Sequence, residues 1–279
     1  MRENHVILSV VIGTYNRLDF LRLTIESVRN ELKGINTAII VVDGGSTDGS
    51  IRWLSKQKDI ITIIQHNRGE WLEKEIKRKS WGYFMNLGFK VAKGKYVCML
   101  SDDCLVVPGA IKNGINLFEM ERDKGNKVGA VAFYWRNWPE QKKYWVGLTL
   151  GNKMFVNHGL YFNQALKEVN YIDEENYNFY HADGDLCLKI WKKGYRIIDS
   201  KTSFIEHYSH ANSGVRSSNM EKQKEDWSHY LEKWGGEYYK VARDNQGGWI
   251  EKEFIDKNNT ANKFLKNLPV LKRIKIKIS

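Results

Sequence analysis

The chain has 279 residues, 42% of them hydrophobic, which is enough for one large domain or a domain with a subdomain. Its net charge of +11, with an isoelectric point near 9.3, favours an anionic partner such as a nucleotide, a nucleic acid or a phospholipid surface. No stretch approaches the ~20 apolar residues of a membrane-spanning helix, and we expect no signal peptide. The three cysteines, Cys98, Cys104 and Cys187, show no CxxC spacing and indicate free thiols in a reducing compartment.

The first half of the chain alternates predicted strands and helices. Short apolar runs, several of them rich in β-branched residues, predict strands over 6–12, 38–42, 60–64 and 96–100. Apolar residues at helical spacing predict helices over 18–28, 50–54, 81–92 and 109–120. This alternation predicts βαβ units, and therefore a mostly parallel sheet with helices on both faces.

The second half has a weaker periodicity. The aromatic segment 133–161 contains turn signals and predicts short strands and loops. A helix is predicted over 185–193, where Gly194 ends it, and a polar, aromatic helical stretch over 220–241. Short strands are predicted over 196–198 and 203–205.

Two adjacent carboxylates, Asp102 and Asp103, follow the apolar run 96–100. They stand at the carboxyl end of a predicted strand, which is where ligands gather in open α/β sheets. Like charges this close raise each other's pKa unless a cation intervenes, and carboxylate oxygens are natural ligands of Mg²⁺ or Mn²⁺. The pair therefore indicates a metal that holds a phosphate, with a solvated turn or a helix cap as the alternative.

Two polar loops follow the first two predicted strands. They are the segments 13–17, Gly-Thr-Tyr-Asn-Arg, and 43–50, Asp-Gly-Gly-Ser-Thr-Asp-Gly-Ser. Each loop alone is typical of turns and helix N-caps. Together with the acidic pair, they place polar residues at three strand ends. There an Asp can accept a hydrogen bond from a base or a ribose, and a glycine lets the backbone approach a ligand.

In their order and spacing, these motifs resemble glycosyltransferase family 2, a group of inverting enzymes with a GT-A fold. The matching segments are 10–17, 41–50, 86–96, 101–103, 171–174, 182–189 and 194–197. The resemblance implies an α/β, GT-A fold with a Rossmann-like, mostly parallel central sheet flanked by helices, a smaller acceptor-side mixed region and a helical C-terminus. We expect 1–125 to bind the nucleotide sugar, 126–215 to bind the acceptor and carry out catalysis, and 216–279 to form a helical extension with a basic, apolar tail.

The resemblance also implies roles for individual residues. Asp183 corresponds to the general base of the family. Asp103 corresponds to a metal ligand, and His207 to a histidine near the diphosphate and the metal. The residues implied to bind the nucleotide are Thr14, Tyr15, Arg17, Asp43, Arg68, Lys79 and Asp102, with Arg78 as a further basic candidate and Asp48 supporting its loop.

Three positions depart from the family pattern. Gly13 replaces a common proline, and Gly44 replaces a frequent second Asp. Ala182 replaces the Glu that precedes the base, which leaves Asp185 as an alternative base. Without the resemblance, we would interpret Asp183 as a helix N-cap, because it precedes or opens a predicted helix.

Two further features concern the acceptor and the location of the protein. We expect most of the aromatic residues to be core, and one or two to contact an acceptor sugar; the candidates are Trp135, Trp138, Tyr144 and Trp145. The segment 263–279 interleaves six basic residues with apolar ones and contains no acidic residue. This pattern suits an anionic membrane surface, with a solvated tail as the alternative.

These observations predict an inverting glycosyltransferase that uses Mn²⁺ or Mg²⁺. It would move a sugar from a UDP- or TDP-sugar to a glycan or lipid-linked acceptor, in the cytoplasm or peripherally on the inner face of the membrane. One alternative is a catalytically silent module that binds a nucleotide sugar or an anionic surface. Another is a sugar-1-phosphate nucleotidyltransferase, which would need a long Gly-rich, Lys-ended loop after the first strand. A nucleic-acid partner is not expected, because no nucleic-acid module is recognisable.

Overall fold

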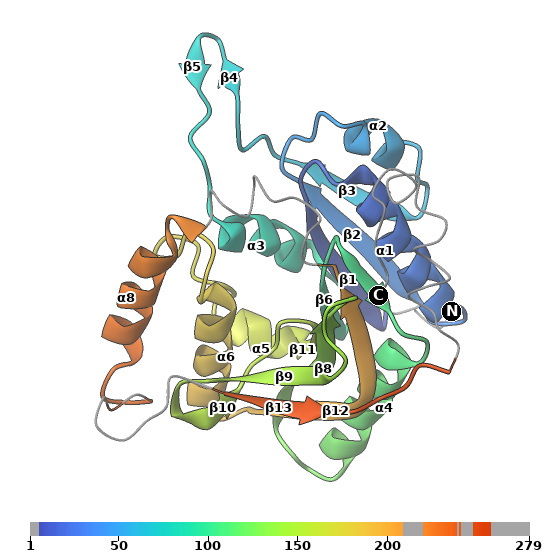
Figure 1. Ribbon diagram of the computed structural model, residues 1–279, viewed down its shortest axis with the longest axis vertical. Coiled ribbons are helices and arrows are strands. Elements are labelled where there is room, and N and C mark those ends of the chain that lie inside the picture. Colours follow the sequence, from blue (N-terminus) through green and yellow to red (C-terminus); the bar gives the residue numbers. More distant parts are fainter. Residues whose placement is uncertain (1–5, 209–219, 239, 241–247, 258–279) are drawn as a thin grey trace.

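A computed structural model describes residues 6–208, 220–238, 240 and 248–257 (Figure 1). Within these residues, an 11-stranded sheet has the central order β10-β9-β8-β11-β6-β1-β2-β3, with β7, β12 and β13 joined at its sides. The parallel strands are β1 (Leu8–Thr14), β2 (Thr37–Asp43), β3 (Ile60–Ile64) and β6 (Tyr96–Ser101). Their helices are α1 (Leu18–Glu31), α2 (Ser50–Leu54), α3 (Trp81–Val91) and α4 (Ala110–Asp123). The strands and helices predicted for the first half are confirmed.

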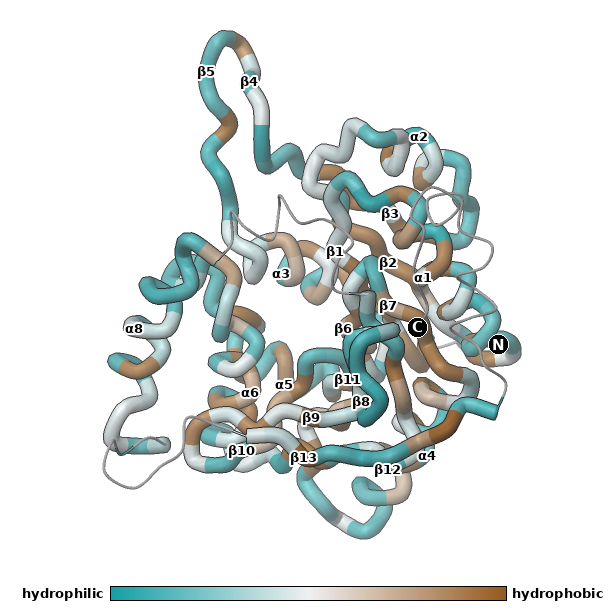
Figure 2. The backbone as a smooth tube through the Cα atoms, viewed as in Figure 1, coloured by the Kyte–Doolittle hydropathy of each residue, from teal (hydrophilic) through white to brown (hydrophobic). Residues whose placement is uncertain are grey.

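Both faces of the central parallel strands β1, β2 and β6 are largely buried, as the run of apolar residues in β1 requires, while the edge strand β3 is partly exposed. Val11 packs on one face in the same cluster as Phe89 of α3, while Val10 and Ile12 pack on the other face with Leu21 of α1. Figure 2 shows the hydrophobic colour concentrated along these central strands. The helix α3 comes close to β1 because position 88 is a glycine, where a Cβ atom would lie 2.4 Å from the Val11 Cγ1 atom.

The other half of the sheet is mixed. Its strands are β7 (Cys104–Val106), β8 (Val128–Asn137), β9 (Tyr144–Thr149), β10 (Lys153–Met154), β11 (Gly159–Phe162), β12 (Arg196–His207) and β13 (Gly248–Lys252). Strand β11 runs antiparallel to both β6 and β8, so it joins the two halves. The helices here are α5 (Asn163–Glu168), α6 (Ala182–Lys192) and α8 (Gln223–Trp234), with a 3-10 turn at Leu150–Asn152. A small hairpin, β4 (Glu70–Trp71) and β5 (Lys74–Glu75), projects from the body in Figure 1.

Three details differ from the sequence prediction. The segments 196–198 and 203–205 belong to one strand, β12, whose register to β8 shifts between Ser200 and Phe204. The helix predicted over 220–241 is shorter, and the extension predicted to be helical also contains β13. This strand is largely exposed and pairs with β9, so its own sequence carries little strand pattern.

The three cysteines are free and buried, as their spacing predicted. No helix within the described ranges is long and apolar enough to cross a membrane. The basic segment 263–279 and His210 lie outside the described residues.

Candidate active site

The ends of β1, β2 and β6 bring the three predicted loops together. Thr14 pairs with Asp43 across β1 and β2, and Gly13 pairs with Ser101 across β1 and β6. Polar groups at the carboxyl ends of parallel strands meet at one edge of the sheet. This edge borders a cleft of about 450 Å³. The predicted site residues that line it are Thr14, Tyr15, Arg17, Arg68, Lys79, Asp102, Asp103, Asp183 and His207, together with Arg78.

Asp43 lies beneath this cleft rather than in its lining. Its Oδ1 atom accepts hydrogen bonds from the backbone N–H groups of Gly45 (2.8 Å) and Ser46 (2.7 Å). Its Oδ2 atom is buried and has no hydrogen-bond partner among the described residues. Gly45 has φ +89°, and a Cβ atom there would meet the ring of His66 at 2.5 Å, so the turn requires glycine. Asp43 therefore shapes the loop and keeps one acceptor atom unused.

Two contacts fasten the first loop to the second. Asn16 accepts from the backbone N–H of Thr47 at 2.7 Å through its side chain, and its own N–H donates to Ser46 Oγ at 2.8 Å. Asp48 accepts from the N–H of Leu18 at 2.8 Å and so holds the start of α1. Asp48 thus supports the loop, as expected.

Basic residues and the ring of Tyr15 form part of the rim of the cleft. The Arg68 guanidinium lies 5.4 Å from the ring centroid of Tyr15. Arg78, from the other end of the projecting hairpin, also lines the cleft, and burial together with the charge of Arg68 lowers its pKa. Asn67 accepts from the Lys79 N–H, which closes the base of the hairpin. This rim can attract an anionic ligand.

The acidic pair is bridged by a cation from the first loop. The Arg17 guanidinium donates to Asp102 and to Asp103, at 2.8 Å in each case. Thr14 also donates to Asp102 at 2.8 Å. Burial, with the neighbouring charge of Asp103, raises the pKa of Asp102 to about 6 although Arg17 opposes this. Against its own burial, His207 and Arg17 lower the pKa of Asp103.

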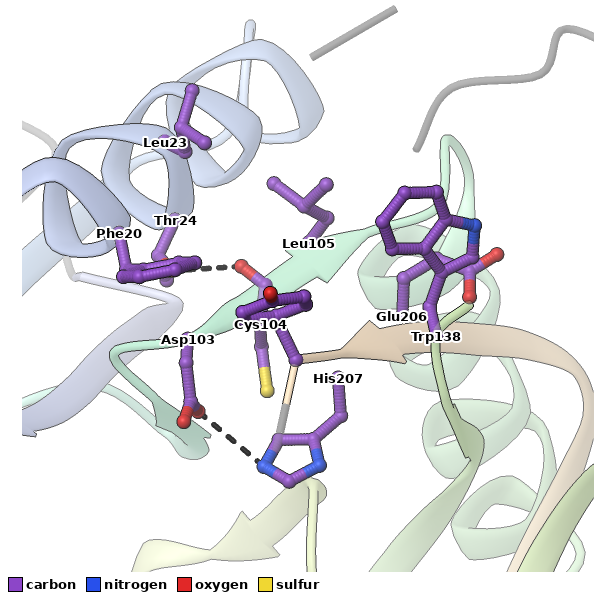
Figure 3. Close-up of a pocket in the computed structure, with 10 residues that line it drawn as sticks. Phe20, Leu23, Thr24, Asp103, Cys104, Leu105, Trp138, Glu206 and His207 are labelled. Atoms are coloured by element: carbon purple, nitrogen blue, oxygen red, sulfur yellow. Dashed lines mark hydrogen bonds and ion pairs between the residues drawn. The ribbon is translucent and has the colours of Figure 1, made fainter. Parts of the chain in front are cut away.

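Asp103 and His207 face each other across a gap that fits a cation. The Asp103 Oδ1 atom is buried without a hydrogen bond and lies 3.4 Å from His207 Nε2 (Figure 3). The His207 Nδ1 atom is 2.9 Å from the Asn137 Oδ1 atom, so Nδ1 carries a proton and donates. In a neutral imidazole, Nε2 would then present a lone pair to the carboxylate. A proton or a divalent metal ion resolves this repulsion, and a carboxylate with an imidazole suits such an ion.

Cys104 is a further possible ligand beside this pair. Its Sγ atom, one Asp103 oxygen and one His207 nitrogen all lie within 4.8 Å of one another. Figure 3 shows these side chains around a small cavity. The sequence offered no signal for Cys104, because its spacing to other candidate ligands became meaningful only when β12 paired with β7.

Asp183 enters the same cleft from the first turn of α6. Its Oδ1 atom accepts from the Gly184 N–H at 2.8 Å, and its Oδ2 atom from the Asn157 amide at 3.2 Å. Burial raises the pKa of Asp183 to about 6. Asp185, the alternative base, is fully buried and pairs with Lys233 at 2.8 Å. Asp185 does not line the cleft. Its ion pair with Lys233 instead connects α6 to α8.

The four aromatic residues considered for acceptor contact lie in different parts of the structure. Trp135 lines the large cleft, and Trp138 lines the small cavity of Figure 3. The Trp145 ring packs against the Trp135 ring at a tilt of 46°, with ring centroids 3.8 Å apart, and Tyr144 is fully buried. Neither Trp145 nor Tyr144 lines the cleft, as expected for core residues.

The sequence reasoning missed one wall of the cleft, the loop 178–181. Asp226 of α8 accepts from the backbone N–H groups of Asn178, Phe179 and Tyr180 at 2.7–2.9 Å. No local signal links this loop to an Asp that lies more than 40 residues later, since the two meet only when α8 packs beside α6.

Comparison with known proteins agrees with this geometry. A family model described as "Glycosyl transferase family 2" matches residues 9–188. The chain is 27% identical over 232 residues to the Escherichia coli protein "UDP-Glc:alpha-D-GlcNAc-diphosphoundecaprenol beta-1,3-glucosyltransferase WfaP", covering 78% of this chain and 82% of that protein.

Two solved structures have a similar fold. One is S. aureus TarS 1-349 in complex with UDP-GlcNAc, with a TM-score of 0.55, 17% identity and coverage of 76% of this chain and 61% of that chain. The other is the mannosyltransferase PcManGT from Pyrobaculum calidifontis in complex with GDP-Man and Mn2+, with a TM-score of 0.51, 17% identity and coverage of 72% and 56%. At this identity the likeness is one of fold, and it confirms the predicted GT-A fold.

Proposed function

The chain belongs to glycosyltransferase family 2, and we propose that it moves a sugar from a nucleoside-diphosphate sugar to an acceptor hydroxyl with inversion of the anomeric centre. The observation that carries this proposal is the content of one cleft. It holds a bridged acidic pair with a facing histidine and, separately, a half-buried carboxylate of raised pKa. The first group suits a diphosphate with its metal, and the second suits a proton acceptor.

The nucleotide would occupy the edge formed by β1 and β2. The Tyr15 ring would offer a stacking face to the base, and Asp43, buried beneath the cleft, would act on the base and ribose by holding the loop 43–46. Arg68 and Lys79 would meet the phosphate charge. A uridine or thymidine diphosphate sugar is the donor that we propose.

A divalent metal fits at Asp103 and His207, with Asp102 beside it. When bound, Mn²⁺ or Mg²⁺ would neutralise the charge that develops on the leaving diphosphate. Without the metal, the Arg17 guanidinium supplies the positive charge next to Asp102 and Asp103. Arg17 therefore stands where it can either bind the diphosphate or balance the acidic pair.

Asp183 would act as the general base. Its carboxylate accepts the proton of the acceptor hydroxyl while that oxygen attacks the anomeric carbon and the bond to the diphosphate breaks. A pKa of about 6 leaves this carboxylate ionised near neutral pH, yet more basic than an ordinary Asp. Single displacement of this kind inverts the anomeric centre.

We propose a glycan or lipid-linked acceptor, at the inner face of a membrane. The basic, apolar composition of 263–279 supports a membrane location. The relative WfaP is described as acting on a diphosphoundecaprenol-linked sugar. The Asn178–His181 wall of the cleft, which includes Phe179 and Tyr180, offers aromatic faces to such an acceptor.

The test is a screen of nucleotide sugars with the full chain, with and without Mn²⁺. We expect one uridine or thymidine diphosphate sugar to raise the melting temperature in a metal-dependent manner, because a ligand that binds only the folded state stabilises it. The same donor should be hydrolysed slowly, or transferred to lipid-linked acceptors. Binding without hydrolysis or transfer would favour the silent module, for which Ala182 is the supporting feature. No binding of any donor would reject the proposal.

A further inference from the structure

Asp183 receives a hydrogen bond from one neighbouring side chain, that of Asn157. This residue lies in the loop between β10 and β11, and its Nδ2 atom is 3.2 Å from Asp183 Oδ2. On its other side, the Asn157 Oδ1 atom accepts from the indole Nε1 of Trp135 at 3.3 Å. Across the described ranges, no other side chain donates to the Asp183 carboxylate.

The indole determines which way the amide points. An indole N–H can only donate, and an ionised carboxylate can only accept. If the Asn157 amide were flipped, its NH₂ group would face the Trp135 N–H, and its oxygen would face the Asp183 oxygen. Both contacts would then be repulsive. The orientation with NH₂ toward Asp183 is therefore the one that satisfies both neighbours.

The backbone on either side of Asn157 is also held. The Val156 N–H donates to Cys187 Sγ of α6 at 3.4 Å. The His158 carbonyl accepts from the Phe133 N–H of β8 at 2.9 Å. Asn157 is thus fixed between the strand that carries Trp135 and the helix that carries Asp183.

We propose that Asn157, held by Trp135, is a positioning residue that aims the Asp183 carboxylate and favours its ionised form. The proposal rests on the proposed role of Asp183 as base and deepens it. A donor to an ionised carboxylate stabilises that form, while burial opposes it. Asn157 would keep Asp183 charged at a site where no cation of the described part of the chain pairs with it.

Other titratable groups near Asp183 do not provide this effect. Tyr161 of β11, Cys187 of α6 and Tyr230 of α8 all interact with it, and burial raises the pKa of each, so they remain neutral. Burial lowers the pKa of His181, which precedes α6, so this ring is neutral as well. Asp185 is neutralised by its ion pair with Lys233.

The first measurement is the pH dependence of transfer by Asn157→Ala, Asn157→Asp and Trp135→Phe. Loss of the Asn157 amide should raise the apparent pKa of the acid limb in the pH profile of kcat/KM by about one unit, because a hydrogen bond to a charged group stabilises that charge by about this amount. The KM for the nucleotide sugar should not change. Asn157→Asp should raise this apparent pKa further, because two carboxylates would then share the site. Trp135→Phe keeps the ring but frees the amide, so a smaller upward shift is expected.

Trp145→Phe is the matched control. It removes the Trp145 indole N–H, which donates to Gln141, from a ring that packs at a tilt against Trp135, and it leaves the hydrogen bonds of Asn157 in place. Its acid limb should not move. If Asn157→Ala lowers stability or total rate while both the acid limb and the pKa of the Asp183 carboxyl group stay in place, the positioning role is overturned and the residue is only structural.

The second measurement separates this inference from the assignment of the base. The free enzyme labelled with ¹³C at Asp carboxyl groups is titrated by NMR, and the Asp183 signal is identified by its loss in Asp183→Asn. Asn157→Ala should raise the pKa of this signal by about one unit. A raised NMR pKa with an unmoved rate profile would reject Asp183 as base and keep the Asn157 contact. An unmoved NMR pKa would reject the Asn157 inference itself.

Discussion

At the scale of single residues, the site separates two kinds of carboxylate by their surroundings. Asp102 and Asp103 share one arginine and face a histidine, so they are arranged around positive charge. Among the described residues, Asp183 has no ion-pair partner, and the groups that donate to it are neutral. Carboxylates in such different environments are suited to different roles, one to a metal with its diphosphate and the other to a proton.

Asp103→Ala should abolish metal binding with the fold retained. The change removes one of two facing ligands and also the charge that balances the metal. Removal of a group that only hydrogen-bonds to a metal ligand lowers metal affinity by roughly 10–100-fold. Removal of a ligand itself should therefore lower the affinity for Mn²⁺ by about 100-fold or more. Calorimetry of Mn²⁺ and of nucleotide in the presence of Mn²⁺ measures this. Asp59→Ala, which removes an exposed partner of Arg29, is the control. Unchanged Mn²⁺ affinity in Asp103→Ala would contradict the metal assignment.

Asp183→Asn should slow transfer by about 100-fold or more and leave donor affinity near normal, since the base acts only when the acceptor attacks.

The wild type should lose activity as the pH falls through about 6, where Asp183 takes up a proton. Its folded pKa lies above the ordinary Asp value, so ionisation costs stability as the pH rises from about 4 to 6. The Asn variant should therefore melt no lower than wild type at neutral pH.

Asp185→Asn is the companion variant for this test. It weakens the buried pair with Lys233, so it should lower the melting temperature more than the catalytic rate constant. Transfer kinetics and thermal unfolding of both variants distinguish the two roles. Normal turnover in Asp183→Asn, with turnover lost in Asp185→Asn, would show that the base has been misassigned.

At the scale of elements, α8 holds the wall of the cleft that precedes the base. The buried Asp226 carboxylate in its first turn accepts from three successive backbone N–H groups of the loop 178–181. His181 has a positive φ, and its ring stacks on Tyr230 and lies near Trp227 of the same helix. The helix α8 therefore determines where the loop ends and where α6, with Asp183, begins.

Asp226→Ala should loosen this wall and weaken acceptor binding. The change leaves several backbone N–H groups without their charged acceptor, so we expect a loss of about 3 kcal/mol of stability. The KM for the acceptor should rise several-fold while nucleotide affinity stays the same, because the proposed nucleotide site lies at the edge formed by β1 and β2. Glu225→Ala is the matched control, because this neighbour is exposed and its ion pair with Lys222 lies on the surface. An unchanged acceptor KM in Asp226→Ala would argue against an acceptor role for the loop.

At the scale of the whole molecule, one sheet carries both halves of the site. The parallel strands carry the loops that we propose to bind the nucleotide, and β11 connects these strands to the mixed half of the sheet. The excess of positive charge is uneven, because the segment 263–279 has six basic residues and no acidic one. Such a segment can bring the cleft to an anionic surface without changing its chemistry.

Deletion of 263–279 should abolish salt-sensitive binding to anionic liposomes and spare transfer to a soluble acceptor analogue. Electrostatic attraction to anionic lipid falls with ionic strength, so wild-type binding should decrease as salt is added. Co-sedimentation with anionic and with neutral vesicles measures this. A variant that keeps the segment but changes its basic residues to Gln separates charge from length. Binding that survives the deletion would favour a solvated tail.

Local patterns in the sequence predicted most of the parallel half. Buried strands such as β1 are continuous apolar runs, and a polar loop directly after such a run must lie at the edge of the sheet. For this reason Thr14, Asp43 and Asp102 were predicted to converge from their positions alone. The choice of Asp183, Asp103 and His207 came from the family resemblance, and the structure brings all three to one cleft.

Tertiary contacts decided the remainder. The register of β12 brought Cys104 beside His207, and the strand β13 formed only because β9 offers it an edge. Asn157 and Asp226 have ordinary sequence surroundings, and their importance comes from side chains and backbone groups that are distant along the chain. Short-range patterns record which face of an element is buried, but a hydrogen bond between distant residues leaves no periodic signal. The sequence by itself therefore determined the framework and the loops at its edge, while packing decided which groups contact the carboxylate of Asp183.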